Sequence, residues 1–97
     1  MHHIESDSLN QLFDAILSLK SREECSKFFD DICTVKEMLD LAQRLDVAVL
    51  LDQGVSYQTI AQKINVSTAT ISRVSRCLNY GSGGYRMALD RLGEDKK

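Results

Sequence analysis

The chain has 97 residues, of which 43% are hydrophobic and only 6% aromatic, so we expect one small domain with an aliphatic core. It contains no proline, which favours an all-α bundle over a β-sandwich or barrel, and its formal net charge of −2 alone argues against a nucleic-acid partner. The distribution of charge along the chain argues differently. Residues 1–53 carry five Lys and Arg against eleven Asp and Glu, whereas residues 54–97 carry seven Lys and Arg against three Asp and Glu. An anionic partner is therefore expected to bind the C-terminal half.

The first half of the chain predicts three helices. Apolar residues at helical spacing indicate a first helix over about residues 8–20. Two capping boxes, Ser21 with Glu24 and Thr34 with Glu37, predict the starts of a second and a third helix. The third is expected to run to Gly54 and is apolar on more than one side, so we expect it to be the buried central element, shared with a second subunit.

The second half predicts a helix-turn-helix over residues 56–80 and a last short helix over 85–92. Ser56 and Ser67 are the expected N-caps of the two motif helices, and Gly81–Gly84 is expected to end the second one as a flexible joint. Ala61 is the small residue needed where the two helices cross, and Asn65 tolerates the left-handed conformation of the turn. The apolar residues expected to hold the inner faces are Ile60, Ile64, Val66, Ile71 and Val74.

The outward face of the second motif helix is typical of a DNA reader. It combines small and hydroxylated residues with arginine and carries no acid, which suits contacts with base edges in the major groove. Side chains at the start of the first motif helix are expected to anchor phosphates, Arg76 to hold the DNA backbone, and Lys63 to add nonspecific attraction. The expected DNA-binding residues are Ser56, Tyr57, Gln58, Lys63, Ser67, Thr68, Ala69, Thr70, Ser72, Arg73 and Arg76.

The same residues carry a family resemblance. The motif Ala69-Thr70-Ile71-Ser72-Arg73, within the frame of Thr34, Gln43-Arg44 and Gly54, resembles the tryptophan repressor (TrpR) superfamily. The run Arg76-Cys77-Leu78-Asn79-Tyr80-Gly81 is similar to its bacterial YerC/YecD branch. The resemblance covers nearly the whole chain and implies a single TrpR-like multi-helical domain over 1–97, with 8–54 as dimerisation core. It implies an intertwined homodimer whose two helix-turn-helix heads enter successive major grooves of a palindromic operator.

The resemblance also bears on ligand control. In the tryptophan repressor two arginines hold the indole ring of the corepressor, and Arg44 and Arg73 match them, while Thr34 matches a threonine from the partner subunit. Two positions depart from the pattern, because Val74 replaces a glycine that leaves room for the ligand and Cys77 replaces a serine. We therefore expect no tryptophan response. Thr34, Arg44, Arg73 and Cys77 stay candidates for another effector, and the alternative for Arg44 is a salt bridge to a carboxylate such as Asp40.

Other readings of the chain are weaker. No run of about 18 apolar residues and no signal-peptide pattern occurs, so a soluble cytoplasmic protein is expected. The cysteines Cys25, Cys33 and Cys77 form no C-x-x-C pair, and we expect them to be buried as small hydrophobic residues. We expect no catalytic residue, metal site or cofactor. The favoured function is a dimeric repressor that acts by occupying promoter DNA; the alternative is a helical protein-interaction module that uses its acidic N-terminal half.

Overall fold

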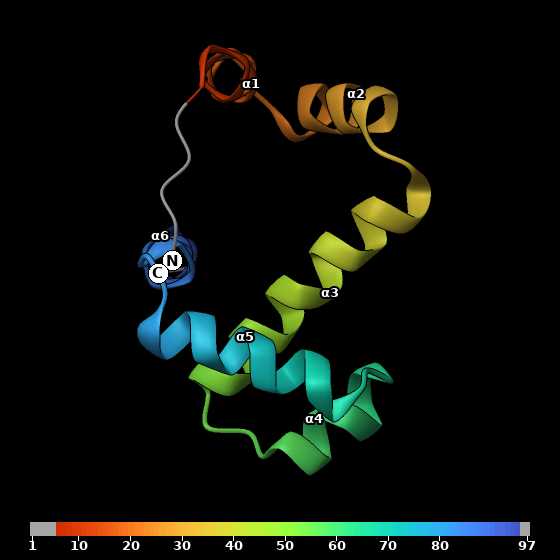
Figure 1. Cartoon of the computed structure of the whole chain (residues 1–97), viewed down its shortest axis with the longest axis vertical. Coiled ribbons are helices and arrows are strands. Elements are labelled where there is room, and N and C mark those ends of the chain that lie inside the picture. The colour runs from red at the N-terminus through yellow and green to blue at the C-terminus, as the bar shows by residue number, and fades with distance from the viewer. Residues whose placement is uncertain (1–5, 96–97) are drawn as a thin grey trace. The chain divides into compact units, whose positions relative to one another are not determined.

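The computed structural model describes residues 6–95, which form six α-helices and no strand, as expected for an all-α protein (Figure 1). The expected domain over 1–97 also includes residues 1–5 and 96–97, which lie outside the described residues. The chain divides into two compact units, one up to Met38 and one from Leu39 onward. No helix in the described part of the chain is both long and apolar enough to cross a membrane.

The first unit contains α1 (Asp7–Leu17), α2 (Arg22–Ile32) and the start of α3 (Val35–Asp52). Both expected capping boxes are confirmed. Ser21 Oγ accepts a hydrogen bond from Glu24 N (3.1 Å), and Thr34 Oγ1 accepts one from Glu37 N (3.1 Å) while Thr34 N donates to Glu37 Oε1 (2.8 Å). Neither α1 nor α2 contains a buried residue. Each is an amphipathic helix whose apolar side chains remain largely accessible in the single chain.

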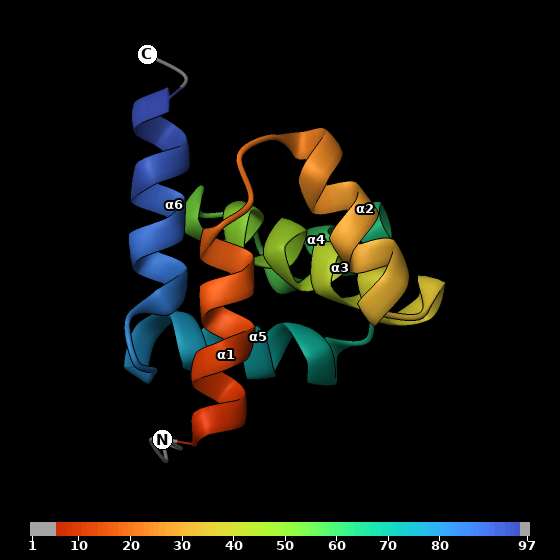
Figure 2. The ribbon, with the colours of Figure 1, turned by 90° about the horizontal axis from the view of Figure 1, so that it is seen from above.

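The second unit contains the rest of α3 together with α4 (Tyr57–Ile64), α5 (Thr68–Tyr80) and α6 (Gly84–Asp95). Helix α5 contacts both α4 and α6, and Figure 2 shows α6 turning away from the end of α5. The core of this unit is aliphatic, as its composition predicts, and draws on all four helices. Its buried members are Val47, Ala48, Ile60, Ile71, Val74 and Leu89.

Three expectations need correction. Helix α3 is not buried on several sides in the single chain, because only Val47 and Ala48 are buried whereas Leu39 is 63% exposed. Cys25 is exposed rather than buried, and the other two cysteines are half-buried. The first helix ends at Leu17 instead of near residue 20, and the last helix extends to Asp95 instead of residue 92.

Candidate nucleic-acid interface

Helices α4 and α5 pack as the helix-turn-helix pattern requires. Ile60 of α4 and Ile71 of α5 are fully buried, so each helix contributes an isoleucine to the core. Asn65 ends α4 in the left-handed conformation (φ 61°, ψ 51°), which confirms its expected place in the turn. Ala61, Ile64 and Val66 pack against the core as partly buried residues. The inner faces of the motif are therefore occupied by the residue set that the sequence predicts.

Both motif helices begin in the same way. Ser56 Oγ accepts a hydrogen bond from Thr59 N (3.2 Å) and donates one to Thr59 Oγ1 (2.9 Å). Ser67 Oγ accepts from Thr70 N (3.1 Å) and donates to Thr70 Oγ1 (3.1 Å). Neither helix has an acidic residue in its first turn. The positive ends of both helix dipoles are therefore not offset by a carboxylate in the first turn of the same helix, which is favourable for an approaching anion.

The outward face of α5 is accessible along its length. The expected DNA-binding residues of α5 and its cap are exposed except Thr70, which is half-buried and accepts a hydrogen bond from Ser67 Oγ, and the α5 sequence contains no acid. Within the part of the chain that the structure describes, no carboxylate forms an ion pair with Lys63, Arg73 or Arg76. These three cations stay available to an external anion. The expected DNA-binding residues that are exposed on α5 and its cap are Ser67, Thr68, Ala69, Ser72, Arg73 and Arg76.

Two tyrosines flank the motif. Tyr57, next to the Ser56 cap, is 42% exposed, and Tyr80, at the end of α5, is 87% exposed. Tyr80 therefore does not pack in the core of the single chain. Both rings are accessible to a partner molecule.

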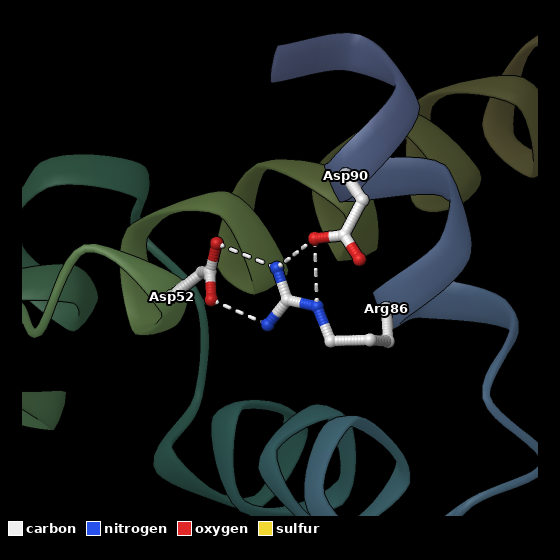
Figure 3. Close-up of polar contacts among 3 residues, drawn as sticks. All are labelled: Asp52, Arg86 and Asp90. Carbon is white, nitrogen blue, oxygen red and sulfur yellow. Dashed lines mark hydrogen bonds and ion pairs between the residues drawn. The ribbon is translucent and has the colours of Figure 1, made fainter. Parts of the chain in front are cut away.

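Arg86 does not belong to this positive surface, although the sequence places it among the cations of the C-terminal half. Its Nη1 and Nη2 donate to the two carboxylate oxygens of Asp52 (2.7 and 3.0 Å), and its Nε donates to Asp90 Oδ1 (3.0 Å) (Figure 3). The hydrogen bonds from Arg86 hold the pKa of Asp52 below its ordinary value and, with those to Asp90, raise the pKa of Arg86. Two carboxylates therefore offset the charge of this arginine.

The candidate effector residues lie in both units. Thr34 belongs to the first, where it caps α3, and Arg44, Arg73 and Cys77 belong to the second. Burial raises the pKa of Tyr85, the charge of Arg44 opposes this rise, and Cys77 adds to it. Tyr85, which packs against the core as a half-buried residue, is thus within electrostatic range of Arg44 and of Cys77. Tyr85 is the first residue of the last helix that the sequence predicts over 85–92, whereas Arg44 and Cys77 belong to α3 and α5.

The family model described as Trp repressor protein matches residues 7–93 of this chain. The chain belongs to the Trp repressor family. It is 56% identical over 91 residues to the uncharacterized protein YerC of Bacillus subtilis, with 94% of this chain and 88% of that protein covered. The family resemblance and the YerC branch inferred from the sequence are confirmed.

Two solved structures of Trp repressor-like proteins are similar throughout. A crystal structure of a proposed Trp repressor from Staphylococcus aureus has a TM-score of 0.88 at 54% identity, covering 92% of this chain and 89% of that one. A TrpR-like protein from Eubacterium eligens also has a TM-score of 0.88, at 50% identity, covering 92% of both chains. The Trp repressor family is a family of regulators rather than of enzymes.

In this member of the Trp repressor family, Val74 is 1% exposed and belongs to the same core cluster as Val47 and Ala48 of α3. The resemblance places a glycine, and space for an indole ring, at that position. Here valine methyl groups occupy the position as part of a packed core. Close-packed interiors do not admit a ring without rearrangement of their neighbours.

Proposed function

We propose that this protein is a sequence-specific DNA-binding transcriptional regulator that acts as a repressor on a palindromic operator. The observation that carries the proposal is the division of α5 into two faces. Ile71 and Val74 anchor its inner face in the core, whereas Arg73 and its exposed neighbours form an outer face without acid. A helix held rigidly on one side can present arginine to guanine and small hydroxylated residues to base edges on the other. The proposal places the activity in the cytoplasm, where bacterial DNA lies.

The proposal includes a homodimer. Helices α1 and α2 contain no buried residue, and large apolar side chains on them and at the start of α3 remain open to solvent. Ordering such helices costs conformational entropy, which burial of their apolar faces must offset. A second copy of the chain can supply that burial and a second reading head. The residues concerned are Phe13 (50% exposed), Leu17 (81%), Ile32 (52%), Val35 (74%) and Leu39 (63%).

We further propose that DNA binding does not depend on tryptophan. A repressor that needs its corepressor must have space for it next to the recognition helix. The observation that supports this is that Val74 is buried at that position and belongs to one core cluster with Val47 and Ala48 of α3. The head is therefore held in its reading arrangement by its own core.

The decisive experiment is selection of random duplex DNA by the purified, ligand-free protein, followed by a salt titration on the selected duplex. We expect a two-fold-symmetric site with half-sites about one helical turn apart. Lys63→Ala is expected to flatten the dependence of log K on log salt concentration by about one unit for each phosphate that Lys63 neutralises, with little change in sequence preference. Added L-tryptophan is expected to leave the affinity unchanged.

Two other outcomes of this experiment would favour a different function. Enrichment only in the presence of a metabolite extract would indicate an effector-dependent repressor and contradict the role given to Val74. If no duplex is enriched and a protein partner is recovered from nuclease-treated extract, the chain is an interaction module and the proposal fails.

A further inference from the structure

Helix α6 is held on the rest of its unit by few apolar side chains. Leu89 is 8% exposed and belongs to the core cluster, and Tyr85 packs against that cluster as a half-buried residue. The other large apolar side chains of α6, Met87 and Leu92, are 50% and 42% exposed. The apolar contact of α6 with the core is therefore small for a helix of 12 residues.

The connection between α5 and α6 depends on glycine. A Cβ atom on Gly81 would lie 2.4 Å from the carbonyl oxygen of Cys77, and Gly83 has a φ of +92°, a conformation that other residues rarely adopt. Glycine restricts the backbone less than any other residue, so this connection by itself does not define the direction of α6. The direction of α6 must be set by what α6 contacts further along.

A polar contact reaches from α6 to another helix. Arg86 forms a bidentate ion pair with Asp52, the last residue of α3, and also contacts Asp90 one turn along α6 (Figure 3). We call these three residues the Arg86 clamp. A carboxylate at the C-terminal end of a helix faces the negative end of the helix dipole and is unfavourable there without a cation. Arg86 supplies that cation from α6 and thereby ties α6 to the end of α3.

The core connects this clamp to the recognition helix. Leu89, three residues after Arg86, lies in one cluster with Ile71 and Val74, which anchor the inner face of α5. Departure of α6 would remove Leu89 from that cluster and leave the inner face of α5 with less packing. The fraction of molecules with α5 in its reading arrangement would then fall, and the apparent dissociation constant rises in inverse proportion to that fraction.

We propose that Arg86 is a positioning residue for DNA recognition, which acts by holding α6 on the end of α3 and so keeping α5 packed in its reading arrangement. The inference rests on the proposed function. It assigns Arg86 no phosphate contact, because Asp52 and Asp90 already offset its charge. Glycines join α6 to α5, and the Arg86 clamp holds α6 at the end of α3. Loss of the clamp would therefore let α6 move away and would weaken the packing of α5.

The clamp offers a matched pair of test variants. Asp52→Asn and Asp90→Asn each remove one negative charge next to Arg86, so their nonspecific effects on DNA attraction are similar. Only Asp52 lies on another helix, since Asp90 is four residues from Arg86 on α6 itself. Binding to the duplex recovered by selection is measured at one salt concentration for both variants. We expect Asp52→Asn to bind about fivefold more weakly than Asp90→Asn, a few-fold effect of the size that loss of an exposed ion pair produces.

Three further measurements distinguish a positioning role of Arg86 from direct contact of Arg86 with DNA. The salt dependence of Asp52→Asn is expected to match that of Asp90→Asn, because both variants keep every cation that faces phosphate. Hydrogen–deuterium exchange of the DNA-free protein is expected to rise in α5 and α6 of Asp52→Asn and to stay near the wild-type level in Asp90→Asn. Asp52→Glu, which keeps the carboxylate, is expected to recover part of the affinity.

Equal affinities of the two variants, or faster exchange in Asp52→Asn without weaker binding, would overturn the inference while the proposed function stands on wild-type binding. A smaller salt slope for Arg86→Gln than for Asp52→Asn would also overturn it, since Arg86 would then bind phosphate directly. If the wild-type protein selects no duplex, the proposed function fails and the inference fails with it.

Discussion

Replacement of Val74 by alanine tests two connected points: that Val74 is closely packed in the core beneath α5, and that no space for an effector exists there. The side chain is 1% exposed, so the substitution removes two buried methyl groups, worth about 1.6 kcal/mol at roughly 0.8 kcal/mol each. The void of roughly 50 Å³ adds about 1.2 kcal/mol if the neighbouring helices do not relax, and the higher helix propensity of alanine returns about 0.5 kcal/mol. We expect a net loss of about 2 kcal/mol in the free energy of unfolding per subunit.

Val66→Ala is the matched control, because it makes the same chemical change at a partly buried position in the turn of the same motif. Urea unfolding followed by far-UV circular dichroism, at one protein concentration, gives both free energies; the fixed concentration matters wherever unfolding is coupled to dissociation. We expect Val66→Ala to lose about 1 kcal/mol, roughly half the loss at Val74. A loss at Val74 no larger than that at Val66 would refute the reasoning, because it would mean that space already exists beside α5.

Three other predictions concern the motif and its surroundings. Arg73→Ala is expected to weaken binding to the selected duplex by about 1–3 kcal/mol and to relax its base preference, and an unchanged preference in a repeated selection would remove Arg73 from the reading face. Gly81→Ala is expected to lower the melting temperature, because its Cβ cannot lie 2.4 Å from the Cys77 carbonyl oxygen; a calorimetric scan equal to wild type would show that the joint accepts a side chain. The lowered pKa of Asp52 stabilises the fold above the ordinary aspartate pKa of 3.8, and this contribution disappears as the pH falls through the lower folded-state value. The urea midpoints of wild type and Asp52→Asn should therefore differ at pH 7 and converge as the pH is lowered below 3.8. If the difference between the two urea midpoints stays constant over this pH range, Asp52 affects stability by some means other than its ion pair with Arg86.

Helix starts could be predicted from the sequence because the signals are local. A serine or threonine hydroxyl caps an amide three residues later, and the caps at Ser21, Thr34, Ser56 and Ser67 are where the sequence places them. Helix ends have weaker local signals. At the end of α1, Ser18 donates to the carbonyl oxygen of Ala15 (2.6 Å), a side-chain bond to the backbone that closes the helix before the apolar pattern stops.

The helix-turn-helix pattern could be predicted for a related reason. Its packing requirements fall on residues within one short segment, so Ala61, Asn65 and the apolar set identify it without knowledge of the rest of the chain. The division of α5 into an inner and an outer face follows from helical periodicity alone. The candidate interface could therefore be recognised before any distance was known.

The sequence by itself determined the order of the helices, the caps at Ser21, Thr34, Ser56 and Ser67, the face of α5 that we propose to read DNA, and the family. Only the tertiary structure decided which charges remain available on that face. Arg86 looks like one more cation of a basic half until the fold brings Asp52 to it from 34 positions away along the chain. Periodicity and capping act over three or four residues, whereas ion pairs between helices depend on where the chain returns, and that is set by the packing of the whole core.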